Sequence, residues 1–397
     1  MGAFRDALAG DGLAFIAEVK RRSPSAGDLR PDADPAAIAS SCERAGAAAI
    51  SVLVDKRFAG TWDDLAAARE HTTVPLLAKG FFSTVEHVEE ALAHGADALL
   101  LLLRDLDDST AGRLMAAAGD RGLDAFVEAH DEGELQRAIA LGADPIGLNA
   151  RDLDTFDVDR KRQLSLVARA PRDRAVVAES GIWNRAQGAE AELAGADAVL
   201  VGSSLMKAPD PAAKLRELAG RPLVKVCGLT REEDVEVAAD AGADLAGFIF
   251  ADVARRAPAV LPVPESMLSV AVFVGAAKET GADLVQLHPE DADGNRGRTA
   301  TILRERREVA QVCDLPWLGT DETHWQTAAR APGRIVLAGG LGPDNVASAI
   351  AAVDPWAVDA SSRLELSPGV KDHEQVRAFV HAARTAKEQP GDEEIGG

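Results

Sequence analysis

One arrangement recurs along the chain: a stretch with helical periodicity, then Gly-Ala-Asp or Gly-Ala-Ala, then a short apolar run. The glycine stands where a helix C-cap is expected, and an unbroken apolar run is typical of a strand buried on both faces. These glycines are Gly46, Gly95, Gly142, Gly195, Gly242 and Gly281. A repeated strand–helix unit predicts an α/β protein with parallel strands and right-handed crossovers.

The first half contains eight predicted strands within about 205 residues, which is the number in a (β/α)8 TIM barrel. An open, doubly wound sheet would more often have five or six strands and a glycine-rich first turn, and no GxGxxG follows the first strand. The predicted strands are 15–19, 48–54, 75–78, 98–103, 125–129, 145–148, 175–178 and 198–201.

The second half begins after the turn-like Gly220-Arg221-Pro222 and contains only seven predicted strands. We therefore expect two tandem TIM barrels, the second missing or eroding one βα unit at the polar, arginine-rich segment 291–307. The seven strands are 223–226, 245–250, 270–274, 284–287, 309–312, 335–337 and 356–358. The expected domains are 1–220 and 221–388, followed by a disordered acidic tail, 389–397.

Composition narrows the classes of protein to consider. The 397 residues carry a formal net charge of −21, which disfavours binding to nucleic acid or to an anionic membrane surface. The longest apolar run, 98–103, is too short to span a bilayer, and no secretory signal is visible. The three cysteines are far apart, without a CxxC or His/Cys cluster, so neither a disulfide framework nor a zinc site is expected. We expect a soluble cytoplasmic protein.

Polar residues end five strands of the first half, where barrel enzymes hold their active sites. Lysines and carboxylates on one rim can shift each other's pKa values in opposite directions, as a proton donor and a proton acceptor at one pH require. Gly181 and Gly202-Ser203 stand where backbone N–H groups can approach a phosphate closely. The charged and amide residues are Glu18, Lys20, Lys79, Glu128, Asn149, Arg151 and Glu179.

The motifs that contain these residues resemble indole-3-glycerol phosphate synthase. They are FIAEVKRRSPS (15–25), LNARDL (148–153) and ESGI (179–182), and the resemblance covers nearly all of residues 4–210. It implies decarboxylative ring closure of 1-(2-carboxyphenylamino)-1-deoxyribulose 5-phosphate to indole-3-glycerol phosphate.

The resemblance also implies roles for individual residues. Lys79 is the general acid at the substrate carbonyl, and Glu128 is the base or a second acid. Lys20 and Arg151 are expected to hold the anionic groups of the substrate, and Glu18, Asn149 and Glu179 to orient it. Phe58 and Phe81 would flank its aromatic ring. The phosphate would be bound by Ser180, Gly181, Gly202 and Ser203, and Ser23 is a further substrate-binding residue.

The second half has a cysteine, Cys227, at the end of its first predicted strand. A lone cysteine is ordinarily a core residue, but a stabilised thiolate can act as a base. The surrounding motifs resemble phosphoribosylanthranilate isomerase: 224–230, GFIF (247–250), QLH (286–288), LAGGL (337–341) and DASS (359–362) with SPGVKD (367–372).

This second resemblance implies an Amadori rearrangement of N-(5-phosphoribosyl)anthranilate, with Cys227 as base and Asp314 as acid. Arg256 is expected at the anthranilate carboxylate. Further substrate-binding residues are Gln286, His288, Gly319, Thr320, Gly340, Ser361 and Ser362. Neither reaction needs a metal or an organic cofactor. The substrates are small phosphosugar derivatives of anthranilate, and we expect a monomer with no nucleic-acid or membrane partner.

Three alternatives remain open at this point. The chain departs from the isomerase motifs at Leu318-Gly319-Thr320-Asp321, at Pro289 and at Arg363. The second half could therefore be a degenerate barrel that serves only as a structural partner of a monofunctional synthase. A phosphosugar isomerase of histidine biosynthesis is the second alternative, although those enzymes use paired aspartates rather than a cysteine. A non-catalytic binding protein, the third, would leave the Lys79/Glu128 pair unexplained.

Overall fold

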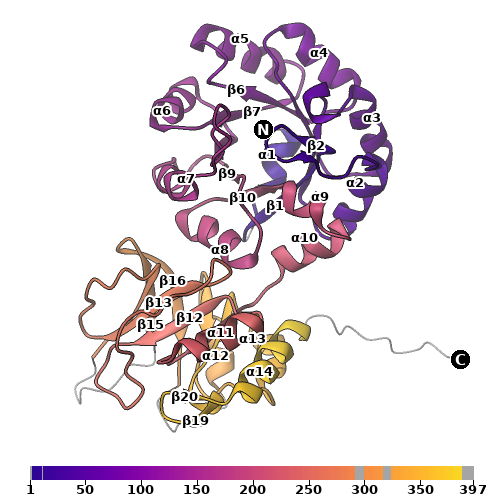
Figure 1. Cartoon of the computed structure of the whole chain (residues 1–397). Coiled ribbons are helices and arrows are strands. Elements are labelled where there is room, and N and C mark those ends of the chain that lie inside the picture. Colours follow the sequence, from indigo (N-terminus) through magenta and orange to yellow (C-terminus); the bar gives the residue numbers. More distant parts are fainter. Residues whose placement is uncertain (1, 11, 291–298, 316–322, 387–397) are drawn as a thin grey trace, which may run out of the picture. The chain divides into compact units, whose positions relative to one another are not determined.

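The computed structural model describes residues 2–10, 12–290, 299–315 and 323–386. The chain divides into two compact units, Met1–Ala219 and Gly220–Gly397 (Figure 1). The predicted tail, 389–397, lies outside the described residues, as do Gly319 and Thr320. No helix within the described ranges is long and apolar enough to cross a membrane.

The first unit is a closed barrel of eight parallel strands, as predicted, with helices around it (Figure 1). The strands are β1 Ala14–Val19, β4 Ala49–Leu53, β5 Leu76–Lys79, β6 Ala98–Leu102, β7 Asp124–Ala129, β8 Ile146–Asn149, β9 Val176–Glu179 and β10 Ala198–Val201. A short hairpin, β2 Arg22–Ser23 and β3 Gly27–Asp28, follows β1.

Six helices of this unit begin at an Asp, Thr or Asn whose side chain accepts from a backbone N–H of the first turn. The helices of the unit are α1 Ala3–Ala7, α2 Pro35–Arg44, α3 Trp62–His71, α4 Val85–Ala93, α5 Asp108–Gly119, α6 Glu132–Leu141, α7 Arg160–Val167, α8 Arg185–Ala194, α9 Ser203–Lys207 and α10 Pro211–Ala219, with a 3₁₀ turn at Lys56–Phe58. The predicted C-cap glycines Gly142 and Gly195 have φ of 76° and 113°, values that a side chain would disfavour. Helix α1 packs Phe4 edge-on against Phe126 of β7, with ring centroids 5.8 Å apart.

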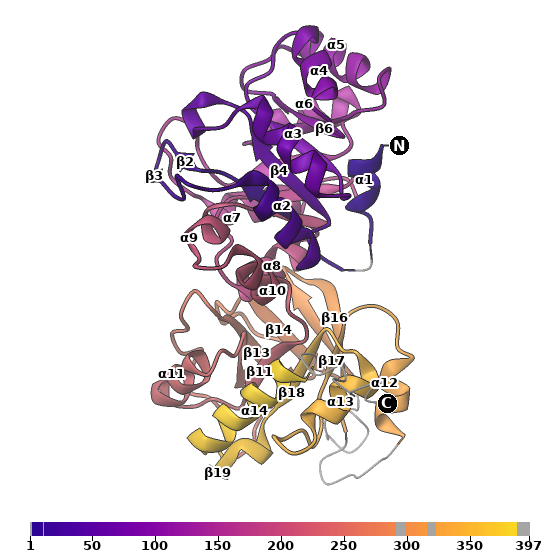
Figure 2. The same ribbon diagram turned by 90° about the vertical axis from the view of Figure 1, so that its right-hand side faces the viewer.

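The second unit is also a closed eight-stranded barrel, so the prediction of seven strands was wrong. Its strands are β11 Leu223–Cys227, β12 Leu245–Ile249, β13 Leu268–Val274, β14 Leu284–His288, β15 Thr299–Arg304, β16 Arg307–Cys313, β17 Ile335–Leu337 and β18 Ala357–Ala360 (Figure 2). The unpredicted strand is β15, which lies in the polar segment and pairs antiparallel with both β14 and β16. The barrel is therefore closed although β15 runs antiparallel to both of its neighbouring strands.

The helices of the second unit are few among the described residues. They are α11 Glu232–Asp240, α12 His324–Ala329, α13 Val346–Val353 and α14 His373–Thr385, with a 3₁₀ turn at Ser362–Leu364 and a hairpin of β19 Glu365–Ser367 and β20 Val370–Lys371. The described residues between β12 and β13, and between β13 and β14, form no helix. The strand–helix repeat of the second half is therefore irregular because connecting helices are absent from these described segments, and not because a strand is lost.

Candidate functional site

A pocket opens at the carboxyl ends of the strands of the first barrel. It brings together residues that the sequence places at β1, β5, β7, β8, β9 and β10. Thirteen of the predicted site residues line it: Glu18, Lys20, Ser23, Phe58, Lys79, Phe81, Glu128, Asn149, Arg151, Ser180, Gly181, Gly202 and Ser203. The fourteenth, Glu179, is fully buried and contacts Lys79.

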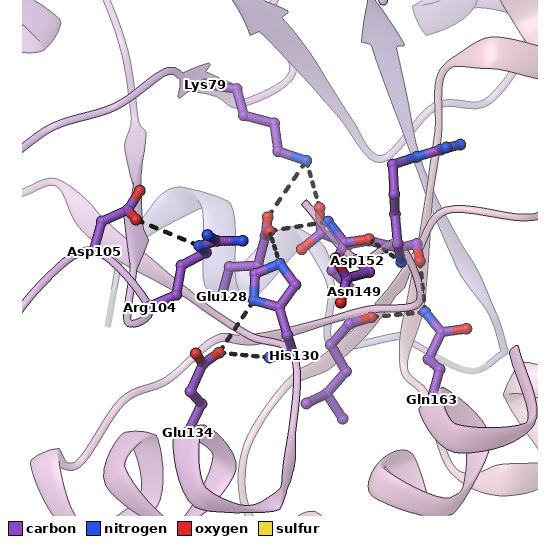
Figure 3. Close-up of polar contacts among 12 residues, drawn as sticks. Lys79, Arg104, Asp105, Glu128, His130, Glu134, Asn149, Asp152 and Gln163 are labelled. Carbon is purple, nitrogen blue, oxygen red and sulfur yellow. Dashed lines mark hydrogen bonds and ion pairs between the residues drawn. The ribbon is translucent and has the colours of Figure 1, made fainter. Parts of the chain in front are cut away.

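Lys79 is the centre of a buried charge cluster, and Figure 3 shows its ammonium pointing toward Glu128. Its ammonium Nζ donates a hydrogen bond to Oε2 of Glu179 and lies 3.4 Å from Oε2 of Glu18 and 3.7 Å from Oε2 of Glu128. All four side chains are at most 10% exposed. Lys20 supplies a second ammonium, which contacts Oε1 of Glu18 at the edge of the cluster. Three carboxyl groups thus face two ammonium groups in a site that is largely closed to water.

This arrangement separates the protonation states of the cluster. Burial alone would lower the pKa of Lys79, but the charges of Glu179, Glu18 and Glu128 outweigh burial and raise it. Burial likewise raises the pKa of Glu179 to about 8, helped by the neighbouring charge of Glu128. Burial opposes ionisation of Glu128 too, yet Lys79 and His130 lower its pKa to about 2. The surroundings thus favour the charged form of Lys79 and the ionised form of Glu128, and they oppose ionisation of Glu179.

His130 is the residue of this cluster that sequence reasoning missed. It follows β7 directly, two residues after Glu128, and its Nε2 lies 3.2 Å from Oε1 of Glu128 (Figure 3). Its Nδ1 lies 3.1 Å from Oε2 of Glu134 on α6. Asn149 donates a second contact to Glu128, from Nδ2 to Oε1 at 2.9 Å. The i,i+2 spacing on a strand was a usable signal, because it puts both side chains on the same face.

The mouth of the pocket combines aromatic and cationic groups. Phe58 and Phe81 stack on each other with ring centroids 6.3 Å apart, and the guanidinium of Arg57 lies 3.4 Å from the Phe81 ring centroid. Arg151 donates from Nη1 to the hydroxyl of Ser25 at 3.3 Å and to the carbonyl of Phe156 at 2.9 Å. Aromatic rings and the partly exposed Arg151 therefore lie together at the entrance.

Glycines shape the walls of this pocket. Ser180 and Gly181 follow β9 with φ of 70° and 75°, which exposes successive backbone N–H groups. A side chain at Gly202 would lie 2.3 Å from Oε1 of Glu18, so the glycine makes room for that carboxylate. A side chain at Gly80 would press on the ring of Phe82, at 2.9 Å.

The second barrel has a buried polar network beside its candidate cysteine. Cys227 ends β11 and is 5% exposed, and Lys225, two residues earlier on the strand, is fully buried. Lys225 donates from Nζ to Oδ2 of Asp359 at 2.7 Å and to Oε1 of Gln286 at 2.6 Å. The Nε2 atoms of Gln286 and His288 lie 2.7 Å apart. Burial alone would lower the pKa of Lys225, but the charges of Asp359 and Cys227 raise it, so this lysine is a cation beside the thiol.

The other predicted residues of this barrel that the structure describes follow or end its strands, apart from Gln286 within β14 and Arg256 in the segment after β12. Arg256 is exposed, whereas its neighbour Arg255 reaches the hydroxyl of Ser361 (Nη1 to Oγ, 3.4 Å). Asp314 is 4% exposed and lies directly after β16. The carbonyl of Gly340 accepts a hydrogen bond from the Arg363 guanidinium, at 3.1 Å. Across the ranges that the structure describes, no group of histidine, cysteine or acidic side chains could hold a metal ion.

Comparisons with known proteins agree with both halves. The family model of indole-3-glycerol phosphate synthase matches residues 2–218, and that of N-(5'phosphoribosyl)anthranilate isomerase matches residues 321–382. The tryptophan biosynthesis protein TrpCF of Yersinia pestis is 35% identical, with 96% of this chain and 87% of that protein covered.

Relatives of the single halves are found as well. The indole-3-glycerol phosphate synthase of Nocardioides sp. is 47% identical over 53% of this chain and 81% of its own length. The solved structure of TrpF from Jonesia denitrificans is 30% identical with a TM-score of 0.35, over 42% of this chain and 98% of that chain. The chain belongs to the family of fused indole-3-glycerol phosphate synthases and phosphoribosylanthranilate isomerases of tryptophan biosynthesis.

Proposed function

We propose that the two barrels catalyse two consecutive steps of tryptophan biosynthesis. The second barrel isomerises N-(5-phosphoribosyl)anthranilate, and the first closes the indole ring of the product with loss of carbon dioxide and water. The observation that carries the proposal is the Lys79 cluster, in which an ammonium and an ionised carboxylate lie 3.7 Å apart in one pocket. Family membership of both halves supports the bifunctional assignment over a synthase with an inert second barrel.

In the first barrel, we assign Lys79 as the acid that protonates the substrate carbonyl oxygen. Although burial opposes its charge, the neighbouring carboxyl groups keep Lys79 protonated, so its ammonium carries the proton to be donated. Glu128 is ionised and is therefore assigned as the base, while the neutral Glu179 can serve as a second proton donor. Glu18, Lys20 and Asn149 position the substrate around them.

The entrance and the far wall of this pocket would bind the rest of the substrate. Phe58 and Phe81 are suited to its aromatic ring, since aromatic groups prefer offset or edge contacts with one another. Arg151 can approach a carboxylate, with Ser23 beside it. The backbone groups at Ser180-Gly181 and Gly202-Ser203 are suited to the phosphate.

In the second barrel, Cys227 would remove the C2′ proton while Asp314 protonates the furanose oxygen. The buried Lys225 supports this role, because a cation beside a thiol favours the thiolate. Gln286, His288, Gly340, Ser361 and Ser362 are proposed to contact the substrate, together with Gly319 and Thr320. Arg256, or Arg255 beside it, would bind the anthranilate carboxylate.

The setting of these reactions is also part of the proposal. The net charge of −21 supports small-molecule substrates rather than nucleic acid as partners, and we propose a cytoplasmic monomer. Neither reaction, as assigned, uses a metal or an organic cofactor.

The direct test is to assay purified full-length protein separately for each step. Isomerisation is followed by the decay of anthranilate fluorescence, and ring closure by the appearance of indole fluorescence. We expect turnover in both assays. Ring closure without isomerisation would refute the isomerase activity and support the synthase activity alone. Absence of ring closure would refute the synthase activity.

A further inference from the structure

His130 joins two carboxyl groups that come from different elements (Figure 3). Nε2 faces Glu128 at 3.2 Å, and Nδ1 faces Glu134 of α6 at 3.1 Å. Glu134 is held in place, because its Oε2 also accepts from the backbone N–H of His130 at 2.8 Å and its own N–H donates to Asp131 at 2.8 Å. The imidazole side chain is 11% exposed, so it stands between the buried Glu128 and the solvent edge of the barrel.

An imidazole between two carboxylates is most stable when both of its nitrogens carry protons. Although burial disfavours the charge of His130, its contacts with Glu128 and Glu134 raise its pKa to about 10. The imidazolium is then the second cation at Glu128, which also faces Lys79 of β5. Arg104, which follows β6, adds positive charge near Glu134.

The two buried carboxyl groups beside Lys79 are therefore not equivalent. Glu128 has His130 and the amide of Asn149 as neighbours in addition to Lys79. Glu179 has Lys79 as its cation and faces the charge of Glu128. Within the described ranges, Oε2 of Glu128, Oε1 of Glu179 and Nε2 of His130 are buried without a hydrogen-bond partner. His130 therefore contacts Glu128 as an ion pair, at 3.2 Å. Such a pair can hold one proton, and the surroundings decide which member holds it.

We propose that His130 is a positioning residue that makes Glu128, rather than Glu179, the ionised member of the pair and hence the proton acceptor of ring closure. The inference rests on the proposed synthase activity and adds to it a residue that does not itself touch the substrate. Without the imidazolium, Glu128 would have Lys79 as its one cationic partner among the described residues, as Glu179 does. The proton would then be shared between them, and the fraction of molecules with the correct base would fall.

The test is the pH profile of ring closure by full-length His130→Asn and His130→Lys variants. Protonation of Glu128 removes the base, so its pKa appears as the acid limb of kcat. We expect kcat of His130→Asn to fall roughly tenfold between about pH 7 and about pH 5, while wild type changes less than about twofold. KM should change little, because His130 does not line the pocket. His130→Lys, which keeps a cation, should move the acid limb back towards wild type.

His71→Asn is the matched control, because His71 is exposed on α3 and its ring Nδ1 lies 3.1 Å from the carbonyl oxygen of Ala67 on the same helix. It should reproduce the wild-type profile. A His130→Asn profile that matches wild type would overturn the proposal. So would an equal loss in His130→Asn and His130→Lys at every pH, since that pattern indicates a structural role.

A second measurement does not depend on activity. The ring signals of His130 in the substrate-free full-length protein, assigned by their loss in His130→Asn, can be titrated by NMR. We expect the ring to stay charged through neutral pH and to lose its proton near pH 10. Titration near the ordinary value of about 6.5 would overturn the proposal. If wild type lacked ring-closure activity, the proposed function would fail while this titration still reported the charge of His130.

Discussion

Lys79 is the last residue of β5 and Glu128 the penultimate residue of β7, and although these strands are not adjacent, their charged groups lie 3.7 Å apart. Alternate strands of a (β/α)8 barrel contribute side chains to the same layer, which is why these two residues converge. The layer is closed to water, so each charge acts strongly on the other. The site thus holds a positive and a negative charge close together in one pocket.

The two adjacent arginines of the second barrel can be separated by experiment. Arg255 contacts Ser361 and lies 3.5 Å from Glu365, whereas Arg256 is exposed. If Arg255 holds the anthranilate carboxylate, Arg255→Gln should raise KM for isomerisation roughly tenfold or more, the value of a charge-assisted hydrogen bond. Arg256→Gln should then change KM less than about twofold. A larger increase of KM in Arg256→Gln than in Arg255→Gln would show that Arg256 binds the anthranilate carboxylate.

Replacement of Cys227 should separate the two activities. Cys227→Ala removes the proposed base, so isomerisation should fall by on the order of 10²-fold or more, with ring closure unchanged. Cys42→Ala is the control: burial raises the pKa of the Cys42 thiol to about 11, and this residue belongs to the first barrel's core. Normal isomerisation by Cys227→Ala would show that another group is the base.

The buried ion pair of the second barrel should govern the stability of that unit. Lys225 is fully buried, and Asp359 is 7% exposed. Asp359→Asn leaves the ammonium without its carboxylate and should destabilise the unit by about 3–5 kcal/mol in chemical denaturation. The double variant Lys225→Met/Asp359→Leu should recover much of this loss, because no uncompensated charge remains. Equal losses in the single and double variants would contradict this account.

Glu179 should make the stability of the first unit depend on pH. Its pKa is raised from 4.5 to about 8 on folding, so the folded state binds an extra proton between these values. The stabilisation is complete below about pH 4.5 and is lost as the pH rises through about 8. Glu179→Gln lacks this titration. Its free energy of unfolding relative to wild type should rise by on the order of a few kcal/mol across that window. A difference that does not vary with pH would contradict the raised pKa.

Most of the first barrel could be predicted from the sequence because its signals are local. Each strand contains a short apolar run, and glycines such as Gly142 end preceding helices. The site residues could be found because parallel strands place their carboxyl ends on one rim. The hydrogen-bond and ion-pair partners of each site residue could not be predicted. Glu134, for example, reaches His130 from a helix whose position depends on packing.

The reversed strand β15 was missed for a different physical reason. It alternates buried and partly exposed positions, with Ala300 and Ile302 inside, and lacks the apolar run typical of a parallel strand. Its hairpin turn is formed by Glu305 and Arg306, both with positive φ, where Asn-Gly would be expected. The sequence therefore contains no turn signal at this place.

The most direct test of the account is the rate of ring closure by full-length Lys79→Met at saturating substrate. Loss of the acid should lower kcat by on the order of 10³-fold or more, while circular dichroism and isomerisation stay as in wild type. Lys161→Met, an exposed position on α7, is the matched control and should be fully active. Ring closure by Lys79→Met within about tenfold of wild type would contradict the central claim that Lys79 is the proton donor.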